Sequence, residues 1–190
     1  MPRQETLALF PLGIVPFPGG LVPLHIVEPR YRQLVADRLA DDRPFGVVYG
    51  TDQQHADVGC ALDIQGIIQK LPDGRLNIIA RGYRRFRIVR PAESPAPYAV
   101  VRAEWIDDER EDVPPALVER TRESFRHVAQ VRGWGLNLPI DVEQDAAMLS
   151  WLIGDSMELA PEARQELLEM TSPTGRLETE ARWLDALMGG

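Results

Sequence analysis

The chain has 190 residues, of which 44% are hydrophobic and 26% charged, a balance typical of a soluble globular protein. Its single cysteine, Cys60, excludes an internal disulfide and any site built from several thiolates. No apolar run approaches the roughly 18 residues that a membrane helix needs, and the N-terminus has no basic-then-apolar leader. We therefore expect a cytoplasmic protein that has no membrane partner.

The net charge of −8 is unevenly distributed along the chain. Residues 1–104 carry a net charge of +2, whereas residues 105–190 carry −10. Such asymmetry indicates two structural units with different surfaces. The acidic run at residues 107–112 is the expected boundary. We predict a domain over 1–106, an acidic linker over 107–112 and a second domain over 113–190.

The first half of the chain is dominated by strand patterns. Five prolines between Pro11 and Pro29 interrupt an apolar segment, which predicts short extended pieces joined by a tight turn at Gly19-Gly20. A short amphipathic helix is expected from Pro29 to about residue 40, because apolar residues there recur at helical spacing. The strands expected after it cover residues 45–49, 60–69, 76–80, 86–89 and 98–106, with a turn at 72–74.

The second half of the chain has helical periodicity. One helix opens at Pro114-Pro115, and another follows Asp141, which has Gln144 three residues on, as in a capping box. Two further helices are expected from Pro161 to Met170 and from Ser172-Pro173 onward. Strands followed by helices favour an α+β arrangement.

Four sequence motifs between residues 7 and 90 resemble the N-terminal substrate-binding domain of Lon-type proteases. They are the proline-rich run Phe10–Gly20, the strand Val58–Ile64, the hairpin Lys70–Arg75 and the strand Arg81–Ile88. The resemblance implies an N-terminal PUA-like small β-barrel with one short helix, followed by a C-terminal helical bundle. It also implies a domain that holds protein substrates and does not cut them.

Catalytic patterns are missing from the sequence. Lys70, the only lysine, is not part of a phosphate-binding loop, and no Ser-Lys pair is legible. Ser156, in Gly154-Asp155-Ser156, has no histidine after it to act as its base. The three histidines do not have metal-ligand spacing. We expect a stand-alone domain that is not an enzyme, has no cofactor and carries neither the ATPase nor the protease module.

The expected partners are unfolded or partner protein segments, with a separate protease as a further possible partner. Apolar or aromatic anchors for such segments are expected in the proline-rich opening and at Trp134, which lies between two glycines. For each of them, packing in the core is the alternative interpretation. The candidate binding residues are Phe17, Pro18, Tyr31, Arg84, Arg85 and Trp134.

The arginines between Arg81 and Arg90 have an alternative interpretation. Basic residues interleaved with Tyr83 and Phe86 are also found in RNA-binding modules, where phosphate neutralisation supplies affinity. Against this, the chain is acidic overall, and strand alternation places Arg84 and Arg85 on opposite faces. Salt bridges within the protein are the favoured interpretation, and a nucleic-acid partner is not expected.

Overall fold

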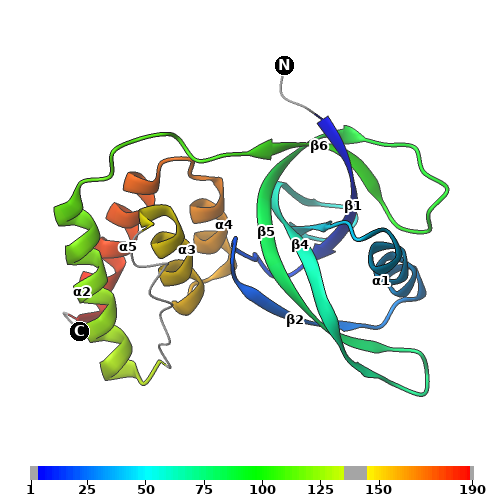
Figure 1. Cartoon of the computed structure of the whole chain (residues 1–190), viewed down its shortest axis with the longest axis horizontal. Coiled ribbons are helices and arrows are strands. Elements are labelled where there is room, and N and C mark those ends of the chain that lie inside the picture. The colour runs from blue at the N-terminus through cyan, green and yellow to red at the C-terminus, as the bar shows by residue number, and fades with distance from the viewer. Residues whose placement is uncertain (1–3, 135–144, 189–190) are drawn as a thin grey trace. The chain divides into compact units, whose positions relative to one another are not determined.

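The computed structural model describes residues 4–134 and 145–188. They form two compact units, Met1–Ile106 and Asp107–Gly190, which are described separately below. The described residues hold six strands and five helices, one of them in the first unit and four in the second (Figure 1). The α+β class is therefore confirmed. No helix among the described residues is both long and apolar enough to span a membrane.

The first unit is a six-stranded sheet with one helix, α1 (Pro29–Asp41). Its strand order is β2-β5-β4-β3-β1-β6, with β1 parallel to β3 and every other pair antiparallel. The strands are β1 (Gln4–Leu12), β2 (Leu21–Ile26), β3 (Phe45–Gly50), β4 (His55–Lys70), β5 (Leu76–Pro91) and β6 (Val100–Ile106). The predicted strands 76–80 and 86–89 are thus one continuous strand, β5.

The length of β5 makes the sheet differ from the simple barrel that was expected. β5 also pairs with β6, so the ring β5-β4-β3-β1-β6 closes on itself. Only the second part of β5, from Arg85 onward, takes part in that closure. The first part, Leu76–Arg81, pairs with β2, which lies outside the ring. The unit is therefore not a clean barrel, because one long strand changes its partner halfway along (Figure 1).

The predicted turn at Gly19-Gly20 is confirmed, and it docks onto β5. The Gly19 N–H donates to the Gly82 carbonyl oxygen at 2.9 Å, and the Gly82 N–H donates to the Gly20 carbonyl oxygen at 2.8 Å. Gly19 has φ of 83°, which favours glycine. A Cβ atom on Gly82 would overlap the backbone carbonyl of Phe17. Glycine at position 82 is therefore required for the opening segment to lie against the sheet.

The core of the first unit lies inside the strand ring. It comprises Leu7, Leu9, Val48, Ala61, Phe86, Val101 and Ala103. The helix α1 covers the sheet through Tyr31, Leu34 and Val35, and the Tyr31 ring stacks on Phe10 of β1 at 3.8 Å between centroids. Burial of such side chains stabilises the fold by roughly 1.5–3 kcal/mol each.

The second unit contains the helices α2 (Pro115–Arg132), α3 (Ala146–Ser156), α4 (Pro161–Glu169) and α5 (Pro173–Met188). Asp145 is the N-cap of α3, and its carboxylate accepts hydrogen bonds from the backbone N–H groups of Ala147 and Met148. The capping box predicted at 141–144 lies outside the described residues. The helices α2, α3 and α5 share one apolar core, which comprises Phe125, Val128, Leu149, Ile153, Met157, Leu177 and Leu184.

The acidic run at 107–112 is bound to the helices that follow it. Asp108 accepts two hydrogen bonds of 2.7 Å from the guanidinium of Arg176, a residue of α5 with no exposed surface. Glu111 accepts hydrogen bonds from the Ser172 hydroxyl and the Thr174 N–H at the start of α5. The run is therefore not only a solvated linker, since Asp108 and Glu111 are hydrogen-bonded to α5 and its first turn.

Candidate functional site

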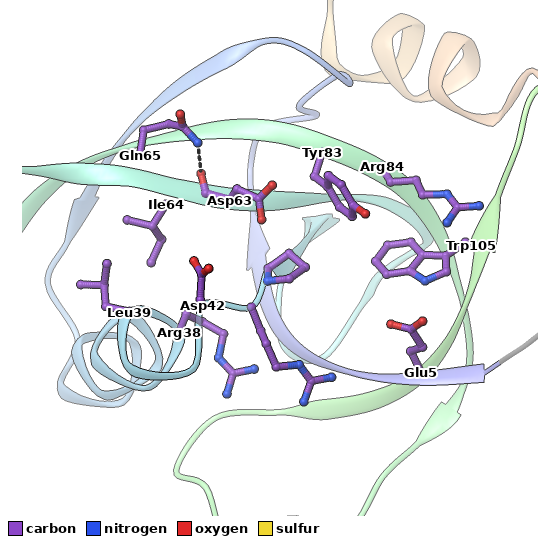
Figure 2. Close-up of a pocket in the computed structure, with 12 residues that line it drawn as sticks. Glu5, Arg38, Leu39, Asp42, Asp63, Ile64, Gln65, Tyr83, Arg84 and Trp105 are labelled. Carbon is purple, nitrogen blue, oxygen red and sulfur yellow. Dashed lines mark hydrogen bonds between the residues drawn. The ribbon is translucent and has the colours of Figure 1, made fainter.

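An open pocket of about 570 Å³ lies in the first unit, between the end of α1 and the strands β4, β5 and β6 (Figure 2). Its walls combine aromatic, aliphatic and charged side chains. The lining residues are Glu5, Arg38, Leu39, Asp42, Arg43, Pro44, Asp63, Ile64, Gln65, Tyr83, Arg84 and Trp105. The space would admit one or two side chains of a bound segment, which makes this pocket the candidate functional site.

Tyr83 reaches the pocket from a β-bulge in β5. Gly82 is aligned with Leu62 of β4 and Arg84 with the adjacent Ala61, so Tyr83 is an extra residue without a partner in that ladder. Bulges of this kind redirect side chains and are frequent near functional sites. The Tyr83 side chain is accordingly left exposed, with 53% of the residue surface accessible.

Tyr83, Arg84 and Trp105 form one aromatic and cationic wall of the pocket (Figure 2). The Tyr83 and Trp105 rings meet edge to face, with 5.9 Å between centroids and an interplanar angle of 89°. The guanidinium of Arg84 lies over the Trp105 ring at 5.4 Å. Such contacts hold the rings in fixed orientations, which lowers the entropy lost when a ligand packs against them.

Two carboxylates line the same pocket, Asp42 from the end of α1 and Asp63 from β4 (Figure 2). Burial raises the pKa of Asp63, and the nearby charge of Asp42 adds to the increase. Asp42 follows α1 in the left-handed conformation, with φ of 52°. Among the residues that the structure describes, neither carboxylate has a hydrogen bond or an ion pair.

The arginines near these carboxylates have other partners. Arg38 forms an ion pair with Asp41 at 2.8 Å. Arg43 donates to the Thr6 carbonyl oxygen at 3.3 Å. Arg81 is aligned with Asp63 in the β4–β5 ladder, but its side chain donates to the Gly19 carbonyl oxygen at 3.3 Å. The pocket as a whole has no excess of negative charge, because Arg38, Arg43 and Arg84 line it together with Glu5, Asp42 and Asp63.

Trp134, one of the predicted anchors, lines a smaller pocket of about 280 Å³ in the second unit. It packs against Phe125 with 6.2 Å between ring centroids and is half-buried. The other lining residues are Arg132, Met157, Glu158, Leu159, Trp183, Ala186 and Leu187. Trp134 is thus partly a core residue and partly a wall of an apolar pocket.

The other five predicted binding residues do not lie together at one site. Phe17 has no exposed surface, and Tyr31 and Arg85 are 5% and 3% exposed, so these three are corrected to interior residues. The Tyr31 hydroxyl also bonds Asp52, 3.3 Å away. Pro18 is half-buried next to the Gly19-Gly20 turn. Arg84 alone among the six lines the larger pocket.

The arginines between Arg81 and Arg90 do not form a single basic face. Arg85 is buried, Arg84 lies on Trp105, and Arg81 bonds the Gly19 carbonyl. Strict alternation also fails here, because Arg85 and Phe86 are both buried. The strand β5 is paired on both edges at this point, with β4 and with β6. This geometry does not favour the RNA-binding alternative.

Several site residues were missed by sequence reasoning. Tyr83 was noted only as part of a basic and aromatic cluster, while Trp105, Asp42 and Asp63 were not singled out. The available signal was Gly82, directly before Tyr83, since glycine within a strand often marks a bulge. Within the described residues, no group of three or more His, Cys, Asp or Glu side chains is placed to hold a metal ion.

The chain was compared with known proteins. Residues 6–186 match the model of the ATP-dependent protease La (LON) substrate-binding domain. The Lon protease of Paraburkholderia phytofirmans is 26% identical over 200 residues, which cover 98% of this chain and 24% of that protein. Lon protease 2 of Myxococcus xanthus is 30% identical over 112 residues, covering 55% of this chain and 13% of that protein. The chain thus spans about a quarter or less of the length of these curated relatives.

Two solved structures are similar along almost the whole chain. The Lon N-terminal domain protein from Xanthomonas campestris has a TM-score of 0.75 and 27% identity, covering 94% of this chain and 98% of that one. The N-terminal domain of the Mycobacterium avium complex Lon protease has a TM-score of 0.73 at 18% identity, covering 95% and 98%, and supports the fold alone. From the family match and the shared fold, we conclude that this chain belongs to the Lon substrate-binding domain family.

Proposed function

We propose that this chain is a non-enzymatic protein-binding module that takes up unfolded or partner protein segments in protein quality control. The observation that carries the proposal is the open pocket of the first unit, with Tyr83 exposed at a bulge and fixed against Trp105. Family membership supports the same role, because the matched model describes a substrate-binding domain. In this proposal a separate protease receives the bound segments.

Binding would combine apolar burial with contacts to a few fixed aromatic rings. A bound segment would place an apolar side chain against Tyr83, Trp105, Leu39 and Ile64, while its backbone stays partly hydrated. Ordering an unfolded segment opposes association, so a single pocket of this size supports modest affinity. Modest affinity suits a module that must release segments after capturing them.

The direct test compares binding to one protein in its native form and in a permanently unfolded form, reduced and carboxymethylated. We expect measurable binding only to the unfolded form, detected by fluorescence anisotropy. Replacing Tyr83 by Ser should weaken that binding about tenfold, the loss typical of removing one aromatic anchor. Equal binding of both forms would contradict the proposal.

A matched control is available on the same sheet. Ile68 of β4 is 65% exposed and does not line the pocket. Ile68→Ser removes a comparable exposed apolar side chain and should leave binding unchanged. If Ile68→Ser weakens binding as much as Tyr83→Ser does, the unfolded protein is not held at this pocket.

A further inference from the structure

We infer that the first unit carries a site for one phosphate group, formed by Arg90 of β5 and Arg102 of β6. The cavity beside these arginines shares no lining residue with the pocket that contains Tyr83, and the inference does not rest on the proposed function. The ligand is defined by its phosphate group, whether that group is free or is carried by a phosphorylated side chain.

The two arginines stand opposite one another on paired strands. Arg90 is aligned with Arg102 in the β5–β6 ladder, and residues placed in this way have Cβ atoms about 4.5–5.5 Å apart. Like charges at such positions repel one another and destabilise the sheet. Within residues 4–134 and 145–188, neither arginine has a hydrogen bond or an ion pair. A bound anion would relieve this repulsion.

A β-bulge brings the two arginines into line. At the preceding position of the ladder Ile88 is aligned with Ala103, so regular pairing would place Val89 opposite Arg102. The register shifts at this point, which makes Val89 the extra residue and places Arg90 opposite Arg102. Bulges redirect side chains and are frequent near functional sites. The costly pairing of like charges is therefore produced by a special feature of the backbone and not by regular alternation.

An open cavity of about 560 Å³ lies beside the pair. Its lining residues are Thr6, Arg90, Pro91, Ala92, Glu93 and Arg102. Thr6 of β1 is aligned with Arg102, so Thr6, Arg102 and Arg90 form one row across three strands. Glu93 is exposed and forms no ion pair with any residue that the structure describes. Two arginines and one glutamate therefore give the cavity a net charge of +1.

A phosphate group suits this row better than a carboxylate does. A phosphate monoester carries a charge of about −1.5 to −2 at pH 7 and three acceptor oxygens, whereas a carboxylate has one charge and two oxygens, which a single guanidinium can hold. Each guanidinium can donate two parallel hydrogen bonds to phosphate. The Thr6 hydroxyl, which has no hydrogen bond to another described residue, adds a further donor.

The test compares two fluorescent peptides that differ only in one residue, phosphoserine or serine, by fluorescence anisotropy with the full chain. We expect the phosphopeptide to bind about tenfold more tightly, as for one charge-assisted contact. In Arg90→Gln and in Arg102→Gln the ratio should fall towards one. Glu93→Gln should raise the ratio, because it removes the acidic side chain of the cavity. Neither arginine variant should unfold more easily than the wild type, because each relieves the repulsion.

Arg87→Gln is the matched control. Arg87 is exposed on β5, is aligned with Glu104 and does not line the cavity, so the same loss of charge should leave the ratio unchanged. A ratio near one in the wild type would overturn the phosphate site. An equal fall in Arg87→Gln would overturn it in favour of a general attraction to positive charge.

Inorganic phosphate distinguishes the two sources of the ligand. If it displaces the phosphopeptide more effectively than sodium chloride at equal ionic strength, the site takes free phosphate. If it displaces the phosphopeptide no better than chloride while the ratio still depends on Arg90 and Arg102, the site takes phosphorylated side chains.

Discussion

The partial burial of Asp63 without a partner has a thermodynamic consequence. Its raised pKa means that the folded protein holds this proton more tightly than the unfolded chain does. The contribution of Asp63 to the free energy of unfolding is therefore most favourable below the unfolded-state pKa of about 4, and it is lost as the pH rises through the folded-state pKa. Asp63 thus lowers stability at neutral pH.

We expect Asp63→Asn to stabilise the protein at neutral pH, by no more than about 1 kcal/mol because the site is open to solvent. The gain should shrink as the pH is lowered towards 4, where the wild-type carboxyl is protonated as well. Urea unfolding at a series of pH values would measure it. Asp57→Asn is the matched control, and a gain of the same size in that variant would indicate a general charge effect.

The strand β5 is the element on which the architecture of the first unit depends. It pairs with β2 and then with β6, it carries the bulge at Tyr83, and it receives the Gly19-Gly20 turn at Gly82. The change of partner and the bulge occur within a few residues of each other. The candidate site therefore depends on the local geometry of this one strand.

Gly82→Ala should be strongly destabilising because its Cβ would overlap the Phe17 carbonyl, which is backbone and cannot turn aside. We expect a loss of about 1–3 kcal/mol in the free energy of unfolding, measured by chemical denaturation. Gly66→Ala is the control, since no atom lies within 4 Å of the Cβ position at Gly66 in β4. Similar losses in both variants would mean that strand propensity, and not the docked turn, controls the effect.

At the scale of the whole molecule, the two units differ in charge and in the way their interiors are built. The second unit buries an ionic network in which Arg176 pairs with Asp108, lies 3.8 Å from the centroid of the Trp151 ring and donates to the Ser150 hydroxyl. Ser150 in turn donates to Glu180, which has no exposed surface. Burial raises the pKa of Glu180 well above its usual value, and the charge of Arg176 and the hydrogen bond from Ser150 offset only part of this increase.

Glu180 should make the second unit less stable as the pH rises. Between the unfolded-state pKa of about 4.5 and the raised folded-state pKa, the folded protein holds one extra proton, so stability should fall by up to about 1.4 kcal/mol per pH unit. Glu180→Gln should remove this slope. Tryptophan fluorescence during urea unfolding would report it, since Trp134, Trp151 and Trp183 belong to this unit. In Glu178→Gln, an exposed change on the same helix, the slope should persist.

Much of this protein could be predicted from the sequence by itself. The helix at Pro29–Asp41, the turn at Gly19-Gly20 and the helices from Pro115, Pro161 and Pro173 follow from proline, glycine and hydrophobic spacing, which act over a few residues. The family was also legible from short motifs in order along the chain, as the match over residues 6–186 confirms.

The tertiary structure alone decided the strand pairing and the candidate site. Contacts between distant segments decide that β5 changes partner from β2 to β6 and that Phe17 and Arg85 are interior. The same contacts bring together the residues that line one pocket, Asp42, Asp63, Tyr83 and Trp105. Local propensity does not encode such contacts, because a bulge shifts the alternation of every side chain beyond it. Hydrophobic pattern therefore determined the elements, and long-range pairing determined which side chains meet.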